Sequence, residues 1–288
     1  VFESIKMVPQ QFMSALDQDV KIPASYKITK NVVLCGMGGS ALGAHIVRAL
    51  DASKVPFLFY NDYRLPRFVN KGTLFIASSY SGNTEEVLFS LNLAIKAKAK
   101  VIGIASGGKL EKRIKTKKLP FIKFDTKFNP SEQPRNGLGY ALGALFNILI
   151  KLDFTEYRVE YLKDLLRNTK APSITKAEKL AKELKGCAPI VVASQFLEGN
   201  AHVLVNQLNE TCKLFSEFNS IPELNHHLME GLKRPELNKK YLKFLFLDSE
   251  LYSPKILKRF KITKDVVKKN KISYTEYRVS RKRRMEQV

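Results

Sequence analysis

Short runs of β-branched and apolar residues alternate with longer helical patterns along the whole chain. In the first half, such runs cover residues 31–35, 55–60, 73–77, 101–105 and 120–124. They are continuous rather than alternating, which is typical of strands covered by helices on both faces. Residues 40–50, 84–99 and 137–150 are predicted to be helices. This order predicts an α/β unit with a parallel sheet of five strands.

The same rhythm returns in the second half of the chain. Residues 153–185 are predicted to form amphipathic helices, and strand patterns follow at 189–193, 213–218, 241–247 and 272–277. The expected fold class is therefore α/β, with two tandem three-layer αβα sandwiches and mainly parallel sheets. We place the two domains at 1–152 and 153–288, and we expect the second to be incomplete and to lack its last helix.

The net positive charge of the chain suggests nucleic acid as a possible partner. The chain of 288 residues has 49 Lys and Arg against 27 Asp and Glu, a net charge of +22. Such a balance favours nucleic acid, but no helix-turn-helix, zinc-finger or RNP-type aromatic pattern accompanies it. The basic segments 109–118 and 281–284 are expected to be solvated faces. We therefore expect no nucleic-acid partner.

Cysteine usage and hydropathy bear on the compartment. The three cysteines are odd in number and far apart, which indicates neither a disulfide framework nor a zinc site. The apolar stretch 139–152 is shorter than the roughly 20 residues that span a bilayer, and no signal peptide opens the chain. We expect a cytoplasmic protein without a membrane partner.

Two loops that follow predicted strands are candidates for ligand binding. The first, Gly36-Met-Gly-Gly-Ser-Ala41, allows close approach of the backbone to an anion, although a tight turn without a ligand would also explain it. The second, Ser78-Ser-Tyr-Ser-Gly-Asn-Thr84, crowds hydroxyls at a helix start, and one such residue is enough for an N-cap. It therefore predicts a cradle for a phosphate monoester at the carboxyl edge of the sheet.

These loops resemble the sugar isomerase (SIS) family of phosphosugar-binding domains, whose S-x-S-G-x-T hallmark corresponds to Ser79-Tyr-Ser-Gly-Asn-Thr84. Three further stretches, Glu132-Gln-Pro-Arg-Asn136, Leu208-Asn-Glu-Thr-Cys-Lys213 and Ile221-Pro-Glu-Leu-Asn-His226, are similar to motifs of the bifunctional phosphoglucose/phosphomannose isomerases. The resemblance runs from about Asn31 to the end of the chain. It implies two SIS domains, a homodimer, and interconversion of glucose 6-phosphate, and of mannose 6-phosphate, with fructose 6-phosphate.

The resemblance also implies roles for individual residues. Glu210 would transfer the proton, His226 would open the sugar ring, and Arg135 would stabilise the enediolate. Substrate binding would fall to two groups of residues, Gly38, Gly39 and Ser40 in the first loop and Ser79, Ser81 and Thr84 in the second. Aldose–ketose isomerisation needs one carboxylate and no redox cofactor, so we expect no cofactor. The adjacent pair His226 and His227 points in different directions, so we expect no metal.

Some positions depart from the family pattern. Ala41, Val203 and His227 stand where the family commonly has glycine, a basic residue and asparagine. A Lys that the family carries near its end cannot be assigned to any residue here. These departures leave a second hypothesis open, a phosphosugar-binding protein without catalysis.

Overall fold

The computed structural model describes residues 1–169 and 173–288. The chain divides into two compact units, Val1–Lys170 and Ala171–Val288, which are called the first and second unit below. The expected boundary followed residue 152, whereas the observed one lies 18 residues later (170 − 152). The helix at 159–167 causes this difference because it packs against a helix near the N-terminus.

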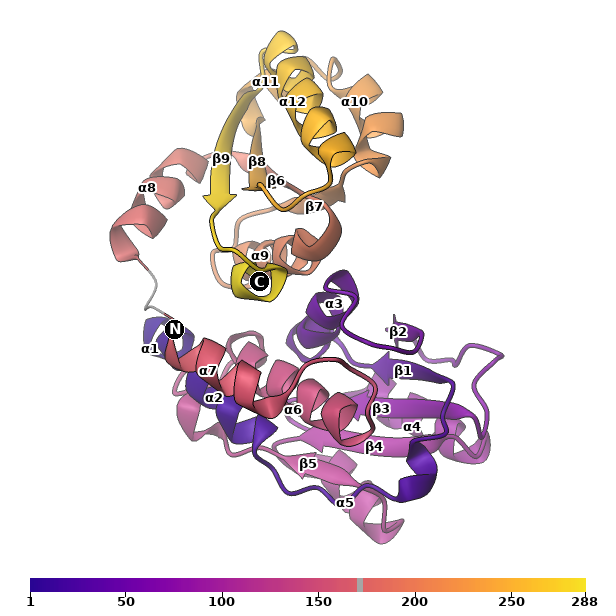
Figure 1. Ribbon diagram of the computed structural model, residues 1–288. Coiled ribbons are helices and arrows are strands. Elements are labelled where there is room, and N and C mark those ends of the chain that lie inside the picture. The colour runs from indigo at the N-terminus through magenta and orange to yellow at the C-terminus, as the bar shows by residue number, and fades with distance from the viewer. Residues whose placement is uncertain (170–172) are drawn as a thin grey trace. The chain divides into compact units, whose positions relative to one another are not determined.

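The first unit is built on a parallel sheet of five strands in the order β2-β1-β3-β4-β5 (Figure 1). The strands are β1 (Asn31–Cys35), β2 (Phe57–Tyr60), β3 (Thr73–Ser78), β4 (Lys100–Ala105) and β5 (Phe121–Lys123). Every neighbouring pair is parallel, and Val33 of β1 lies opposite Phe75 of β3. The predicted α/β class with parallel sheets is confirmed.

Helices cover both faces of this sheet. They are α1 (Phe2–Lys6), α2 (Val8–Leu16), α3 (Leu42–Ala49), α4 (Glu85–Lys96), α5 (Gly108–Thr116), α6 (Leu138–Lys151) and α7 (Val159–Arg167). Short 3₁₀ turns are η1 (Ala24–Tyr26), η2 (Gly38–Ala41), η3 (Thr126–Phe128) and η4 (Pro134–Asn136). Leu91 of α4 and Ile114 of α5 pack with Val33, Phe75 and Val101 in one core layer. On the other side, α2 and α3 both pack against α6.

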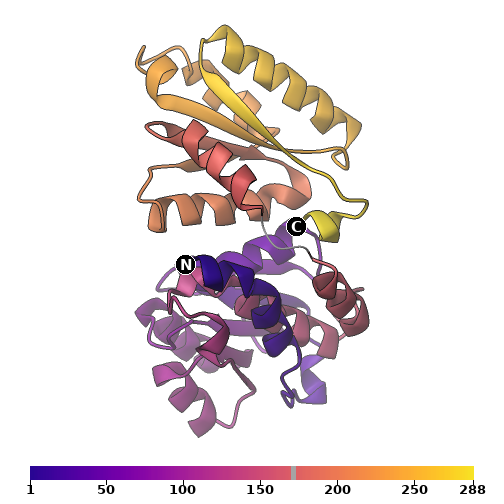
Figure 2. The ribbon, with the colours of Figure 1, turned by 90° about the vertical axis from the view of Figure 1, so that its left-hand side faces the viewer.

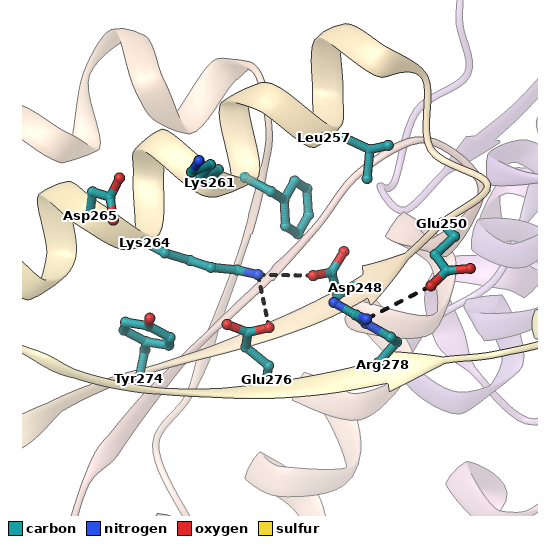
Figure 3. Close-up of a pocket in the computed structure, with 10 residues that line it drawn as sticks. Asp248, Glu250, Leu257, Lys261, Lys264, Asp265, Tyr274, Glu276 and Arg278 are labelled. Atoms are coloured by element: carbon teal, nitrogen blue, oxygen red, sulfur yellow. Dashed lines mark hydrogen bonds and ion pairs between the residues drawn. The ribbon is translucent and has the colours of Figure 1, made fainter.

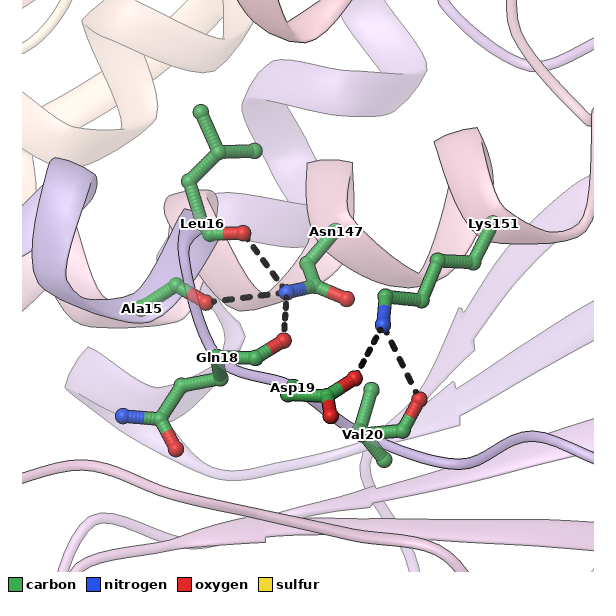
Figure 4. Close-up of polar contacts among 7 residues, drawn as sticks. All are labelled: Ala15, Leu16, Gln18, Asp19, Val20, Asn147 and Lys151. Atoms are coloured by element: carbon green, nitrogen blue, oxygen red, sulfur yellow. Dashed lines mark hydrogen bonds and ion pairs between the residues drawn. The ribbon is translucent and has the colours of Figure 1, made fainter.

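Polar residues of the apolar helix α6 fasten the N-terminal segment (Figure 4). The side chain of Asn147 is buried and donates to the backbone carbonyls of Leu16 at 2.7 Å and Gln18 at 2.8 Å. Leu16 is the last residue of α2, whose final carbonyls have no partner within the helix, and Gln18 lies two residues beyond it. The Lys151 ammonium donates to the Val20 carbonyl. The stretch 139–152 is therefore an internal packing helix.

The second unit repeats this plan with four strands in the order β7-β6-β8-β9, again all parallel. The strands are β6 (Ala188–Ala193), β7 (Glu217–Ser220), β8 (Leu242–Ser249) and β9 (Ser273–Val279). The helices are α8 (Ile174–Leu184), α9 (Glu198–Glu210), α10 (Leu228–Gly231), α11 (Asn238–Tyr241), α12 (Pro254–Lys269) and α13 (Arg284–Gln287), with 3₁₀ turns η5 (Gln195–Leu197) and η6 (Glu223–His226). Helix α12 packs on β9 (Figure 2).

One predicted strand is wrong in position. The pattern of residues 213–218 predicted a strand, but β7 begins at Glu217. Lys213 has a positive φ of 54°, and the Leu214 amide donates to the Leu208 carbonyl, so the chain turns back on the end of α9 there. Phe215, which gave the pattern its apolar character, is 65% exposed.

The basic segment 109–118 forms α5 and the turn after it. Its apolar residues Leu110 and Ile114 face the core. Hydrogen bonds from Lys115 and Lys123 lower the pKa of the Glu111 carboxyl below its usual range. Lys115 of the segment is thus paired within the helix, and Glu111 also pairs with Lys123 of β5.

Candidate functional site

Three loops meet at the carboxyl edge of the first sheet. They follow β1, β3 and β4 and comprise residues 36–41, 79–84 and 106–108. Ligands of open α/β sheets bind at this edge, because helix N-termini and loop amides converge there. No role was predicted for the loop after β4, although a serine and two glycines at a strand end, Ser106-Gly107-Gly108, are typical of a ligand-binding loop.

Ser40 ties the first loop to the second. Its Oγ accepts a hydrogen bond from the Tyr80 amide at 2.8 Å, and its carbonyl accepts one from the Ser78 hydroxyl at 2.9 Å. Ser40 was predicted to contact substrate. In the structure, Ser40 fixes the distance between the two loops through its side chain and its carbonyl.

The second loop gathers hydroxyl groups at the start of α4. The hydroxyls of Ser79 and Thr84 lie 2.8 Å apart, and the Asn83 amide donates to Ser81 Oγ at 3.2 Å. Ser79 is buried, Thr84 is half-buried and Ser81 is exposed. Glu85 and Glu86 occupy the first turn of α4 and reduce the positive potential of that helix end. An anion here would therefore depend on hydroxyl and amide donors more than on the helix dipole.

Glycines allow the second loop to lie against the third. Gly82 has a φ of +70°, and a Cβ there would come within 1.9 Å of the Gly107 carbonyl oxygen. On the other side, Lys109 donates its amide to Asn83 Oδ1 at 3.1 Å. The backbone of the loop 79–84 is thus fixed by its contacts with the N-terminus of α5.

Replacing Gly82 by alanine is expected to distort this loop. We expect a loss of at least about 3 kcal/mol in the free energy of unfolding, because left-handed strain adds to a backbone clash. We also expect at least about tenfold weaker binding of fructose 6-phosphate, since a loop shift of about 1 Å misplaces its donors. Urea unfolding and calorimetric titration measure both quantities.

Gly186→Ala is the matched control for Gly82→Ala. Gly186 also has a positive φ, +76°, but a Cβ there meets nothing within 4 Å. Gly186→Ala should lower the free energy of unfolding by only about 1 kcal/mol, from left-handed backbone strain, and leave the affinity for fructose 6-phosphate unchanged. Equal losses of stability in the two variants would contradict the role assigned to the contact between Gly82 and Gly107.

Arg135 reaches the same edge from η4. A Cβ on Gly39 would come within 2.7 Å of the Arg135 amide nitrogen, so glycine at this position permits the contact between η2 and η4. The guanidinium of Arg135 donates to Gln133 Oε1 at 2.9 Å. Asn129 joins this segment to the second loop, because its Nδ2 donates to the Tyr80 hydroxyl at 2.8 Å and to the Gln133 carbonyl at 2.9 Å.

Burial raises the pKa of the Tyr80 hydroxyl above its usual value. This group is therefore neutral at physiological pH and can serve as a donor beside the loops. No role was predicted for Tyr80, Asn129 or Gln133, because the hydrogen bonds that Asn129 makes to the other two leave no pattern in the sequence. The structure thus gathers Gly38, Gly39, Ser40, Ser79, Ser81, Thr84 and Arg135 at one edge of the first sheet.

The two remaining predicted residues belong to the second unit. Glu210 is the last residue of α9, and its Oε1 accepts a hydrogen bond from Asn206 Nδ2 at 2.6 Å. His226 ends η6, which follows β7, and is exposed. Its neighbour Asn225 fastens this turn to α12 by donating to the Thr263 hydroxyl at 2.7 Å.

Glu210 and His226 lie toward opposite ends of the second sheet. Helix α9 starts after the carboxyl end of β6 and runs back along the sheet for 13 residues. At 1.5 Å per residue this is about 20 Å. Strand β7 then returns to the carboxyl end, where His226 follows it. One copy of the second unit therefore does not bring these two side chains to the same point.

The second unit also has a groove between α12 and β9 (Figure 3). The Lys264 ammonium lies in it, 2.9 Å from Asp248 Oδ2 and 3.0 Å from Glu276 Oε2. Arg278 pairs with Glu250 at 3.7 Å. With Lys261 and Asp265, four acidic and three basic side chains line the groove, and five of the seven are paired, so it offers a ligand only a small excess of negative charge.

Two kinds of feature are missing from the parts of the chain that the structure describes, 1–169 and 173–288. No three His, Cys, Asp or Glu side chains there come together as they would around a metal ion. Within the same ranges, every helix is too short or too polar to span a bilayer.

Comparisons with known proteins agree with this architecture. A model of the bacterial phospho-glucose isomerase C-terminal SIS domain matches residues 173–288. The C-terminal domain of glucosamine-fructose-6-phosphate aminotransferase from Francisella tularensis has a TM-score of 0.67 at 16% identity, covering 97% of this chain and 88% of its own. At that identity the likeness shows the fold alone. Together with the SIS family model, it confirms the predicted fold class.

Sequence relatives are more specific. The bifunctional phosphoglucose/phosphomannose isomerase of Caldicellulosiruptor bescii is 33% identical over 289 residues, which cover 93% of this chain and 82% of the relative. That of Aquifex aeolicus is 32% identical over 244 residues, covering 83% of this chain and 72% of the relative. With identity at this level over most of both chains, the chain belongs to the bifunctional phosphoglucose/phosphomannose isomerase family.

Proposed function

We propose that this chain interconverts glucose 6-phosphate, and mannose 6-phosphate, with fructose 6-phosphate. The observation that carries the proposal is the meeting of the hydroxyl loop 79–84 with Arg135 at one sheet edge, in a chain of this family. The hydroxyls and amides of that loop suit a phosphate monoester. The guanidinium of Arg135 suits an oxyanion that develops beside it.

The reaction moves one proton from carbon 2 to carbon 1 and one from the oxygen on carbon 2 to the oxygen on carbon 1. His226 opens the ring by exchanging protons with the ring oxygen and the anomeric hydroxyl. Glu210 then takes the proton from carbon 2 of the open aldose while electron density moves to the carbonyl oxygen, giving an enediolate. The proton of the carbon-2 hydroxyl passes to the oxygen on carbon 1, and return of the first proton to carbon 1 leaves a hydroxyl at carbon 1 and a ketone at carbon 2. Substrate and product have the same atoms and oxidation level, so no oxidant or reductant enters the balance.

We propose further that the enzyme is a homodimer whose active centre takes Glu210 from one subunit and His226 from the other. The positions of these residues toward opposite ends of the second sheet support this. We place it in the cytoplasm, where thiols stay reduced, because all three cysteines are free.

The test is conversion of fructose 6-phosphate, measured separately to glucose 6-phosphate and to mannose 6-phosphate, with the 288-residue chain. We expect both products, with a ratio set by small differences in contacts at carbon 2. Calorimetric binding of fructose 6-phosphate without turnover would instead support a phosphosugar-binding protein without catalysis. Absence of both binding and turnover would contradict either function.

A further inference from the structure

The carboxylate of Glu210 is held by a residue one helical turn before it. Asn206 donates from Nδ2 to Glu210 Oε1 at 2.6 Å. The other end of the same amide, Oδ1, is buried and has no hydrogen-bond partner within the described chain. Burying an unpaired carbonyl opposes folding. The amide keeps this orientation despite that penalty, which indicates that the hydrogen bond from its nitrogen to Glu210 has a function.

The chemistry of the contact requires a donor at position 206. A carboxylate only accepts hydrogen bonds, so it needs an N–H or O–H group opposite it. An amide oxygen or a second carboxylate in the same place would repel it. Asparagine four residues before glutamate on a helix supplies this donor, because residues i and i+4 lie on the same face.

The backbone that carries Glu210 is fixed independently. Asn209 donates to the Ser216 carbonyl at 2.9 Å and accepts from the Ser216 amide at 3.2 Å, which fastens the end of α9 to the approach to β7. The Lys213 ammonium donates to the Glu210 carbonyl at 2.7 Å. With the main chain held in this way, the contact with Asn206 acts on the orientation of the carboxylate itself.

The place of Glu210 in its helix makes such a donor valuable. The C-terminal end of a helix carries partial negative charge, which disfavours a carboxylate. The Lys213 ammonium offsets part of this charge by its hydrogen bond to the Glu210 carbonyl, and the Asn206 amide donates directly to the Glu210 carboxylate. A charge-assisted hydrogen bond to one oxygen fixes the direction of the carboxylate that is to accept the substrate proton.

We propose that Asn206 is a positioning residue for Glu210, one that holds the carboxylate oriented for proton transfer. This inference rests on the proposed function of Glu210. Asn206 need not contact the sugar, and it acts through the hydrogen bond to Oε1.

The test compares Asn206→Asp with Asn200→Asp in the full chain. Asn200 lies on the same helix, also has a buried Oδ1 without a partner among the described residues, and donates to the Val288 carbonyl instead of a glutamate. Both substitutions replace an amide donor by a carboxylate. Only Asn206→Asp places the new carboxylate against Glu210.

Two readouts separate positioning from stability. In Asn206→Asp, the acidic limb of the pH profile of kcat/KM should move up by about one to two pH units, because two adjacent carboxylates share one proton. The ¹³C resonance of the Glu210 side-chain carboxyl, assigned with Glu210→Gln, should titrate at a correspondingly higher pH. Asn200→Asp should leave both unchanged, even if it lowers the melting temperature as much.

The outcomes distinguish this inference from the proposed function. Unchanged profiles and titrations in Asn206→Asp, or equal shifts in Asn200→Asp, overturn the positioning role while isomerase activity stands. If the isomerase proposal is wrong, the unmodified chain will not convert fructose 6-phosphate. The ¹³C titration of Glu210 would still test its contact with Asn206 in that case. If Asn206→Asp does not fold, Asn206→Ser should lower kcat about tenfold with little change in KM, and an unchanged kcat would equally refute the proposal.

Discussion

Replacing Glu210 by glutamine is expected to lower kcat for fructose 6-phosphate about a thousandfold, because a positioned base contributes roughly 10²–10⁴ to such a rate. Glutamine keeps nearly the same size, so helix α9 and its packing should persist. What it loses is the ability to take a proton from carbon. The dissociation constant of fructose 6-phosphate should therefore change less than about twofold.

Solvent exchange makes this prediction specific for proton transfer. Fructose 6-phosphate incubated with the unmodified chain in deuterated water should gain deuterium at carbon 1, since the enediolate can be reprotonated by Glu210 after it exchanges with water. Glu210→Gln should abolish this exchange. Glu178→Gln, on the exposed face of α8, is the matched control and should keep both exchange and turnover. Full turnover in Glu210→Gln would remove Glu210 from the mechanism.

The strands of the first sheet could be predicted because they are buried on both faces. Val32, Val33 and Leu34 in β1, and Leu74, Phe75 and Ile76 in β3, are fully buried, so selection for burial leaves continuous apolar runs. The edge strand β7 has no such signature. The predicted strand began at residue 213 because it included the apolar Phe215, but that side chain is exposed and precedes β7, which begins at Glu217.

The hydroxyl loop could also be predicted, since its chemistry is local in sequence. Ser79, Ser81 and Thr84 lie within six residues of one another at a strand end. The groups that support it could not, because they arrive from distant positions. Gly107 lies behind Gly82, and Asn129 reaches Tyr80 across 49 residues.

Asn206 shows a third limit of sequence reasoning. A polar residue on a helix is most often solvated, so its identity carries no signal. Only the hydrogen bond to Glu210, together with a buried oxygen on the same amide, distinguishes it from other asparagines.

Mixing two inactive variants is expected to restore activity, which is the second large effect. Glu210→Gln and His226→Ala should each be inactive as homodimers, because each lacks one group at both centres. In a mixed dimer, one centre combines the intact Glu210 of one subunit with the intact His226 of the other. At equal concentrations after subunit exchange, half of the dimers are mixed and half of their centres are intact, so activity should reach about a quarter of the unmodified level.

The double variant Glu210→Gln/His226→Ala gives the converse result. Mixed with an equal amount of the unmodified chain, it disables both centres of every mixed dimer, because each centre then has one defective partner. Activity should be about a quarter of that of the unmodified chain at the same total protein concentration. If each subunit carried a complete centre of its own, about half of that activity would remain. Native mass spectrometry, with one of the two chains labelled with ¹⁵N, confirms that mixed dimers form. No recovery in the first mixture and half activity in the second would show that both residues serve the same subunit, despite their positions toward opposite ends of the second sheet.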